Sequence, residues 1–494
     1  MTALSREALT SLPLWVARPA YDPAGIATGI VHLGLGAFHR AHQAVYTDSV
    51  LKSDRRWGIC GVSLKTPRVA HALARQDGLY TVLERGAAGT SARVVGAVRE
   101  TGFLGAGSES VTARFADPAV HVVSLTVTEK GYCHDPATGR LDQTHREIAH
   151  DLTHRRSPVS TIGVLVAGLA ARRASGSGPI SVVCCDNLPQ NGRMVEGLVT
   201  SFAQAVDPDL GDWIGTHVAF PCTVVDRIVP ATTDADIREA ADLLGVADAA
   251  PVATEPFSDW VIENRFAAPR PAWEEAGARV VADVAPFESL KLRLLNGSHS
   301  TLAYLGFLLG HEYLWQAAAD PLLGTLVERM MALEVVPTLE VPEDVDLRSY
   351  CAQLLARFRN PALPHRTEQI AMDGSQKLPP RLLATVRDRL RGGGSIEHLV
   401  LAIAGWIRYA SGTDGQGRSI TVADPLASRF SAIAADARGN AAQIADGFLG
   451  LTAVFGDDLG GNPAFRNAVA RDVGSLMRNG VRRTLAVFIG QTRA

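Results

Sequence analysis

The sequence predicts an α/β domain with a mostly parallel sheet, followed by a largely α-helical domain. Up to about residue 285, short runs rich in valine and isoleucine recur between helical patterns, which is typical of strands joined by crossover helices. Beyond that residue the pattern is helical. A chain of 494 residues is also too long for one ordinary hydrophobic core. We therefore expect one domain over residues 1–285 and a second over residues 286–494.

Short apolar runs predict the strands, and longer periodic segments predict the helices. The expected strands are GIVHLGLG, WGICGVSL, RVVGAV, VHVVSLTVTE, ISVVCCDNL and HVAFPCTVVDRIVP. The expected helices of the second domain are SLKLRLLNGSHSTLAYLGFLL, LGTLVERMMALEV, LRSYCAQLLARFRN, PPRLLATVRDRLRGGG and SIEHLVLAIAGWIRYASG. No internal repeat or long linker interrupts this order.

Composition and charge describe a soluble globular protein. Hydrophobic residues make up 47% of the chain and charged residues 20%, and the net charge of -3 argues against nucleic acid or an anionic membrane as the main partner. No apolar run approaches the length of a membrane span, and the N-terminus lacks the order of a signal peptide. The six cysteines contain no C-x-x-C pair, which fits a reducing cytoplasm and offers no cysteine zinc site.

The first strand leads into a glycine turn that is typical of dinucleotide binding. In IVHLGLGAFHRAHQ, Gly34 and Gly36 precede a helix, so a pyrophosphate could approach backbone amides at the helix N-terminus. His39 replaces the third glycine of the usual fingerprint, and a plain strand-to-helix turn explains the glycine pair equally well. If the turn binds a nicotinamide cofactor, the domain is Rossmann-like. The expected contacts are then Leu33, Gly34, Gly36, Ala37, Phe38, His39 and Arg40.

The residue that reads the cofactor ribose is expected just after the second strand, WGICGVSL. No acid follows there, because the next residues are KTPR, with Lys65 and Arg68. These cations suit a 2′-phosphate better than a free ribose hydroxyl, so NADP stays open beside NAD and Arg68 is a candidate cofactor contact. NAD is still expected first, since a surface turn of this composition is commonplace.

The stretch LKLRLLNGSHS places a lysine, an asparagine and a histidine in a leucine-rich helix. At about 100° per residue, Lys291, His299 and Asn296 fall at roughly 0°, 80° and 140°, so they share one side of the helix. A lysine that snorkels from a core helix beside a hydrogen-bonded asparagine explains the same residues. The alternative is a catalytic lysine with two polar assistants at the start of the second domain.

Six motifs with polar residues follow one another along the chain. They are GLGAFHRAHQAVYTD, SLTVTEKGYC, CCDNLPQNG, FPCTVVDRIVP, EPFSDWVIE and KLRLLNGSHS. Together they resemble the mannitol dehydrogenase family, the long-chain polyol-specific dehydrogenases, from about residue 13 to about residue 490. The segment NPALPHRTEQIAMDGSQKLPPR is most similar to the fructuronate reductases, also called D-mannonate oxidoreductases. The resemblance implies NAD as cofactor, a monomer, and chemistry without zinc.

The resemblance also assigns roles to polar residues of both domains. Lys291 is the expected general acid/base, because a lysine desolvated in a cleft can have its pKa lowered from about 10.4 towards neutrality. Asn187 and Asn296 would hold the developing alkoxide, as an oxyanion hole does. His299 would bind and orient the substrate. No convincing set of metal ligands accompanies these residues, so we expect no metal.

Other candidates have a structural explanation as well as a functional one. Glu288 and Glu129 could relay the proton to solvent, or they could be a surface carboxylate and a turn residue. Asp226 resembles a ligand of substrate hydroxyls, although it could simply pair with Arg227. One further segment either binds substrate or is an ordinary basic surface. Its candidate residues are Arg366, Gln369, Lys377 and Arg381.

The residue at position 369 bears on the substrate. Mannitol-oxidising relatives tend to carry arginine where this chain has Gln369, whereas Arg366 and Lys377 suit the carboxylate of a sugar acid. We therefore expect a zinc-independent oxidoreductase that transfers a hydride between a nicotinamide cofactor and the secondary alcohol or ketone of an open-chain sugar derivative. The substrate pair that we expect first is D-mannonate and D-fructuronate. The alternatives are a dehydrogenase of mannitol, arabinitol or sorbitol, and a nicotinamide-binding protein without turnover.

Overall fold

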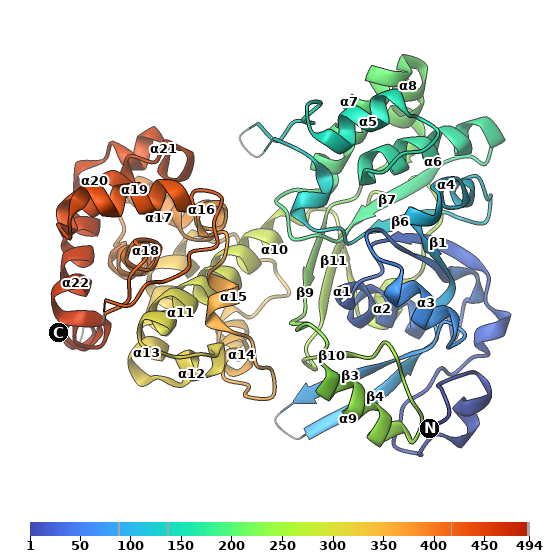
Figure 1. Ribbon diagram of the computed structural model, residues 1–494, viewed down its shortest axis with the longest axis horizontal. Helices are drawn as coiled ribbons and strands as arrows, with labels where there is room; N and C mark the ends of the chain where they lie inside the picture. Colours follow the sequence, from blue (N-terminus) through green and yellow to red (C-terminus); the bar gives the residue numbers. More distant parts are fainter. Residues whose placement is uncertain (87–88, 136–137, 416, 492–494) are drawn as a thin grey trace. The chain divides into compact units, whose positions relative to one another are not determined.

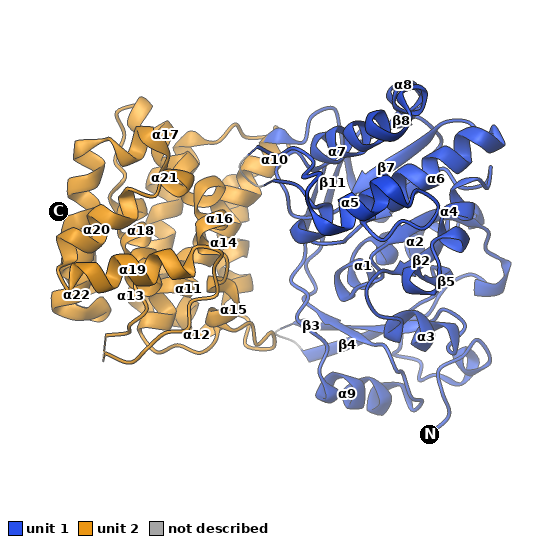
Figure 2. Ribbon diagram, turned by 45° about the horizontal axis from the view of Figure 1, so that its top comes forward, with its two compact units in different colours: residues 1–285 blue, residues 286–494 orange. Residues whose placement is uncertain are grey.

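The computed structural model of the chain describes residues 1–86, 89–135, 138–415 and 417–491. The chain divides into two compact units, Met1–Ala285 and Pro286–Ala494 (Figure 2). The strands of the described residues lie in the first unit, and the second unit is built from helices (Figure 1). The predicted order of an α/β part followed by an α-helical part is confirmed.

The core of the first unit is a six-stranded sheet whose paired strands all run parallel. Its strands are β1 (Thr28–Leu33), β2 (Gly58–Ser63), β5 (Val98–Phe103), β6 (Val122–Leu125), β7 (Ile180–Cys184) and β8 (Val218–Ala219). The strands β1, β2, β6 and β7 are buried along their whole length. A parallel sheet covered on both faces gives continuous apolar runs, which explains why these strands could be predicted.

Helices cover both faces of this sheet. They are α1 (Ala37–Ala41), α2 (Gln43–Val50), α3 (Arg68–Ala74), α4 (Glu109–Phe115), α5 (Arg146–Thr153), α6 (Thr161–Ser175), α7 (Asn191–Val206) and α8 (Pro208–His217). The helix α9 (Asp234–Leu244) lies elsewhere in the unit, in a core with Leu83 and Val94. On β1, Ile30 packs in a core with residues of α2 and α3, whereas Val31 and Leu33 pack in a core with residues of α4, α6 and α7. Successive side chains of a strand point to opposite faces, which explains this division.

The strand order places a topological switch point beside β1. The order across the sheet is β5-β2-β1-β6-β7-β8, so the chain runs from β1 towards one edge and then returns to the other side of β1. Dinucleotide-binding α/β folds have this order, and their ligands bind in the crevice outside the carboxyl ends of the strands at the switch point. The carboxyl ends of β1 and β6 are therefore where a ligand site is expected.

Two small sheets of three strands accompany the large one. Their strands are β3 (Tyr80–Gly86), β4 (Gly89–Val95) and β10 (Val252–Thr254) in one sheet, and β9 (Thr223–Asp226), β11 (Asp259–Glu263) and β12 (Arg279–Val281) in the other. The pairs β3–β4 and β9–β11 are antiparallel. The runs RVVGAV and TVVD therefore lie outside the parallel sheet to which we assigned them, because a β-branched run does not reveal its pairing partner.

The second unit is organised around α11 and α18, which are buried on most sides. Its helices are α10 (Ala285–Leu290), α11 (Gly297–Leu308), α12 (Leu314–Ala319), α13 (Pro321–Arg329), α14 (Leu347–Phe358), α15 (Thr367–Ala371), α16 (Gly374–Leu378), α17 (Ala384–Arg391), α18 (Glu397–Ala410), α19 (Ala427–Ala437), α20 (Ala441–Leu449), α21 (Thr452–Gly460) and α22 (Pro463–Gln491). The helix α11 packs against α12, α15 and α18, and α18 also packs against α20 and α22. Among the described residues, no helix has the length and apolar character needed to cross a bilayer.

The segment that carries Lys291 is a π-helix and not the α-helix that we predicted. In η7 (Lys291–Asn296) the hydrogen bonds follow the i→i+5 pattern, so the assumption of about 100° per residue is wrong there. Lys291 and Asn296 consequently lie about one turn apart. Two other π-helical segments, η8 (Met330–Val335) and η10 (Pro379–Leu383), pack against η7. Such segments are rare and occur frequently at functional sites.

The two glycines after β1 differ in what their backbone requires. Gly34 has a φ of 104°, and a Cβ there would lie 2.1 Å from the carbonyl oxygen of Thr126. Gly36 has a φ of -87°, and the nearest atom to its Cβ would be 3.7 Å away. Only the first position excludes a side chain on steric grounds.

We therefore predict that Gly34→Ala lowers the free energy of unfolding by more than about 2 kcal/mol, because it combines backbone strain with a clash against main chain. Gly36→Ala is the matched control and should stay within about 0.5 kcal/mol of the wild type. Chemical unfolding followed by circular dichroism measures both. Equal midpoints for the two variants would contradict this account of the turn.

Candidate active site

The turn after β1 is tied to the end of β6 by a buried histidine. The Nδ1 of His32 lies 2.8 Å from Ser124 Oγ, and its Nε2 lies 2.9 Å from Thr126 Oγ1 and 3.1 Å from the carbonyl oxygen of Gly34. Thr126 Oγ1 also donates to the carbonyl of Gly34 at 2.8 Å. Burial lowers the pKa of His32 to about 3, so the ring is neutral. These contacts fix the glycine turn at the switch point.

The residues after the turn differ in what they expose. Gly36 is exposed at the start of α1, whereas His39 and Arg40 are buried. The ring of His39 stacks on His32 with 3.4 Å between centroids. The guanidinium of Arg40 donates to the carbonyl of Ala250, inside the unit. The backbone around Gly36 is thus the accessible part of this segment, and the side chains of His39 and Arg40 serve its packing.

A half-buried carboxylate, that of Asp186, connects the ends of β6 and β7. Asp186 accepts the N–H groups of Val127 and Thr128, each at 2.9 Å, and the hydroxyl of Tyr132 at 2.5 Å. Burial raises the pKa of Asp186, and the three hydrogen bonds oppose that rise. Asn187 is the next residue and is exposed at this edge of the sheet.

Glu129 follows Thr128 and opens the 3₁₀ turn η5 (Glu129–Tyr132), where it is exposed. Because β1, β6 and β7 are neighbours in the sheet, the contacts of Thr126 and Asp186 bring three predicted features to adjoining strand ends. These features are the glycine turn, Glu129 and Asn187. The first unit therefore assembles a polar edge at its switch point.

Asp226 ends β9 and is buried. The amide of Asn191 holds this strand near β7, since its Nδ2 donates to the carbonyls of Asp186 and Thr223, each at 3.0 Å. The neighbouring Arg227 forms an ion pair with Glu84 at 2.5 Å. The structural explanation that we considered for Asp226 was a simple ion pair with Arg227. The structure shows that Arg227 pairs with another carboxylate, that of Glu84.

The predicted residues of the second unit cluster around η7. Glu288 lies in α10, Lys291 begins η7, Asn296 ends it, and His299 lies in the first turn of α11. Asn296 Nδ2 and His299 Nε2 are buried and have no hydrogen-bond partner among the described residues. Unpaired buried polar atoms are uncommon and are explained where a ligand supplies the missing partner.

Aromatic side chains surround the histidine. The ring of His299 stacks on Phe358 with 5.7 Å between centroids and an interplanar angle of 8°. His365 lies beside it, with 5.1 Å between ring centroids. Burial lowers the pKa of His299 well below its ordinary value, and burial with the charge of Lys377 lowers the pKa of His365 to about 4. Both rings are therefore neutral near pH 7.

Cations also gather around His299. The positive charges of Arg381, Lys377 and Arg357 all act to lower its pKa, in addition to burial. Arg381 is buried, and its Nη1 donates to Ser300 Oγ at 3.1 Å. A buried guanidinium beside partly buried cations favours an anionic ligand. The second unit therefore combines neutral hydrogen-bonding rings with fixed positive charge.

Arg366 and Gln369 are exposed, whereas Lys377 is half-buried. Arg366 is exposed, forms an ion pair with Glu312 at 3.1 Å, and lies over the ring of Tyr313. Gln369 is exposed in α15. The ammonium of Lys377 instead donates to the backbone carbonyl of Ile370 at 3.3 Å. Glu312 thus compensates the charge of Arg366, whereas Lys377 and Arg381 lie near the ring of His299, which makes them candidates for binding an anion there.

Sequence reasoning missed His365 and Arg357. His365 directly precedes Arg366 in the segment that we singled out, and this closeness to candidate residues was the available signal. Arg357 precedes Phe358 at the end of α14, in a stretch that reads as an ordinary amphipathic helix. Only the fold reveals that the two residues adjoin His299.

One group of potential metal ligands is present in the described residues. Cys133, His145 and Glu147 offer ligand atoms within 4.8 Å of one another. The thiol of Cys133 donates to Glu147 Oε2 at 3.8 Å, and burial raises the pKa of that thiol to about 12. The three residues form a hydrogen-bonded group that contains none of the proposed catalytic residues.

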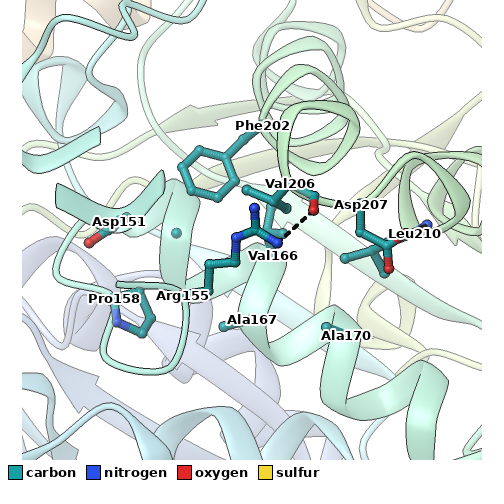
Figure 3. A pocket seen from close by; sticks show the side chains of 11 residues that line it. Asp151, Arg155, Pro158, Val166, Ala167, Ala170, Phe202, Val206, Asp207 and Leu210 are labelled. Atoms are coloured by element: carbon teal, nitrogen blue, oxygen red, sulfur yellow. Dashed lines mark hydrogen bonds between the residues drawn. The ribbon is translucent and has the colours of Figure 1, made fainter. Parts of the chain in front are cut away.

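A pocket of about 200 Å³ lies in the first unit among α5, α6, α7 and α8 (Figure 3). Its lining is mainly apolar, with Val166, Phe202 and Leu210 among the contributors. Arg155 lies across it and donates to the carbonyl of Val206 at 2.7 Å. The pocket contains none of the predicted site residues.

A glycine turn at the switch point of a parallel sheet, with polar groups at the neighbouring strand ends, defines a dinucleotide-binding unit. Two family models match the chain, the mannitol dehydrogenase Rossmann domain over residues 28–275 and the mannitol dehydrogenase C-terminal domain over residues 283–477. The chain belongs to the mannitol dehydrogenase family, as its motifs predicted. It is accordingly an oxidoreductase that acts on secondary alcohols.

Three similar proteins illustrate the range of the family. A D-mannonate oxidoreductase of Escherichia coli is 47% identical and covers 96% of this chain and 98% of its own length. A mannitol 2-dehydrogenase of Pyricularia oryzae is 39% identical and covers 95% of each chain. The solved Pseudomonas fluorescens mannitol 2-dehydrogenase, a complex with NAD and D-mannitol, superposes with a TM-score of 0.90 at 37% identity and covers 99% of this chain and 100% of its own.

The expectation that a lysine replaces zinc in the chemistry leads to a prediction about metal. We expect the purified enzyme to hold clearly substoichiometric zinc, and exhaustive treatment with a strong chelator should leave its dehydrogenase rate unchanged. Cys133→Ser should behave in the same way, because the thiol acts only as a hydrogen-bond donor. Elemental analysis and rate measurements before and after chelation test this. Activity that is lost on chelation and restored by zinc would contradict it.

Proposed function

We propose that the enzyme oxidises the secondary alcohol of D-mannonate to the ketone of D-fructuronate with NAD, and catalyses the reverse reduction. The cationic surroundings of His299 carry this proposal, because the carboxylate of a sugar acid needs fixed positive charge. The 47% identity to a D-mannonate oxidoreductase supports it. The chemistry is zinc-independent, with a lysine in place of a metal.

The glycine turn is the proposed site of the cofactor pyrophosphate. Gly36 is exposed, and the space that a Cβ would occupy there is open, so a ligand can approach the backbone closely. The N–H groups of Ala37 and Phe38, at the start of α1, face no earlier helical carbonyl and are suited to phosphate oxygens. Bound NAD would supply the hydride acceptor.

NAD is the proposed cofactor, although the segment after β2 also suits NADP. Lys65, Thr66 and Arg68 are exposed there, and Arg68 is the first residue of α3. A contact between Arg68 and a 2′-phosphate would favour NADP, whereas the NAD complex of the Pseudomonas fluorescens relative supports NAD. Kinetics with both cofactors decide between them.

Lys291 is the proposed general base, which takes the hydroxyl proton as the hydride leaves the carbon. Asn296 and Asn187 are proposed to stabilise the alkoxide, and the buried, unpaired Nδ2 of Asn296 supports this role. His299 orients the substrate. The proton then leaves through carboxylates, for which Glu288, within the helix that leads into η7, and Glu129 are the candidates.

We propose a monomeric enzyme of a reducing compartment, the cytoplasm. All six cysteines are free thiols, and five of them are buried. Thiols kept reduced inside a protein are typical of that compartment.

A second candidate function is a neutral polyol dehydrogenase. The mannitol 2-dehydrogenase relatives, at 39% and 37% identity, favour it, and so does the wide range of substrates within the family. The two functions differ in whether the site must neutralise a carboxylate. Substrate preference therefore separates them directly.

For the base, we predict that Lys291→Ala lowers the oxidation rate by about two to four orders of magnitude, the usual contribution of a positioned acid–base group. Binding of NADH should be nearly unchanged. Lys291→Arg is the matched variant, because it keeps the positive charge but cannot release its proton near neutral pH, and it should be as slow as the alanine variant. Single-turnover rates measure both variants, and near-normal oxidation by either would overturn the assignment.

For the substrate, we predict that kcat/KM for mannonate exceeds that for mannitol, arabinitol and sorbitol by at least about tenfold, the value of a charge-assisted contact. Lys377→Met should remove most of this preference. Arg366→Met is the control and should keep it, because Glu312 already compensates that guanidinium at 3.1 Å. Steady-state kinetics of the wild type and both variants, with NAD and with NADP, provide the test. A wild type that prefers a neutral polyol would replace the proposed function by the second candidate.

A further inference from the structure

His365 occupies a position that its sequence context does not explain. It lies outside the regular helices, in the loop before α15, with its ring 5.1 Å from that of His299 and tilted by 54°. The loop is held firmly, because the N–H of Leu314 donates to the carbonyl of His365 at 2.9 Å and the N–H of His365 donates to the carbonyl of Leu363 at 2.8 Å. The ring is therefore presented by a fixed backbone.

The two histidines share a feature that bears on ligand binding. His365 Nδ1 and His299 Nε2 are both buried, and neither has a hydrogen-bond partner among the residues that the structure describes. Leaving an unpaired nitrogen in each of two neighbouring rings is unfavourable for a structural pair. A ligand that offers both donors and acceptors would satisfy them together.

The surroundings determine which ligand atoms fit. Burial and the charge of Lys377 keep His365 neutral, so its ring offers one N–H donor and one acceptor nitrogen. A hydroxyl group both donates and accepts, and it matches a neutral imidazole. A carboxylate only accepts, and it matches the neighbouring cations Lys377 and Arg381 better.

We infer that His365 is a second substrate-binding histidine, which hydrogen-bonds a hydroxyl group of the open-chain sugar substrate next to the group oriented by His299. This inference rests on the proposed function only in that the ligand of the pair is the enzyme's own polyhydroxylated substrate. His365 sets affinity and hydroxyl recognition, and it takes no part in moving the proton or the hydride. It is a specificity-determining residue and not a general base.

The test compares His365→Leu, His365→Asn and a control, His311→Leu. His311 is a partly exposed histidine of the same unit that already has a partner, Asp320, at 3.3 Å. Asp320 is also held by Arg482 at 3.0 Å, so the control substitution leaves that carboxylate paired. All kinetics use the substrate that the wild type turns over fastest among mannonate, mannitol, arabinitol and sorbitol.

His365→Leu should raise KM about five- to tenfold with little change in kcat, because a ground-state hydrogen bond is lost and the reacting groups are intact. His365→Asn should recover part of the affinity, since an amide also donates and accepts. His311→Leu should leave KM unchanged. Thermal unfolding of each variant verifies that the fold is intact, and the asparagine variant carries the test if the leucine variant does not fold.

Mono-deoxy analogues of the substrate identify the contact itself. For one analogue, the increase in KM caused by the missing hydroxyl and the increase caused by His365→Leu should not add, because each change removes the same hydrogen bond. Additive effects for every analogue, or a KM for His365→Leu within twofold of the wild type, would overturn the inference. A wild type that prefers a neutral polyol would refute the proposed substrate but not this inference, because the same comparison is then made on that polyol.

Discussion

The hydrogen bonds to Asp186 are the constraint on which the polar edge of the first unit depends. Burial of this carboxyl raises its pKa, and only the donors at Val127, Thr128 and Tyr132 make its presence there tolerable. The same bonds join the loop after β6 to the end of β7. Because Asn187 directly follows Asp186, the group that holds the strand ends together also sets the position of a proposed alkoxide ligand. Stability and function share one set of contacts at this edge.

In the second unit, two proposed site residues have buried polar atoms without partners among the described residues. Asn296 and His299 stand at the junction of η7 and α11, where the helix changes from π to α geometry. The junction continues into the buried helix α11, which packs against α12, α15 and α18. A substrate that completed the hydrogen bonds of such a well-packed site would meet little reorganisation.

Local patterns in the sequence predicted those parts of the fold and site that depend on neighbours along the chain. The buried strands and the glycine turn belong to this group. The π-helix was missed because its geometry depends on packing against η8 and η10 and not on residue types in the stretch itself. The partner of Arg366 was missed because Glu312 lies far away in the sequence. The same reason explains His365, whose importance depends on a contact with His299 that no periodicity encodes.

The charges of the second unit have two effects, and both follow from one arrangement. Lys377 lies close enough to His365 to lower the pKa of that ring, and it acts in the same direction on His299. A cation that would attract the carboxylate of the proposed substrate therefore also keeps the neighbouring rings uncharged, in the state that can donate to and accept from hydroxyl groups. Had the rings been protonated, they would offer donors only and would repel the cations around them. Recognition of an acid and recognition of its hydroxyl groups are thus compatible in this unit because full charge is confined to lysine and arginine.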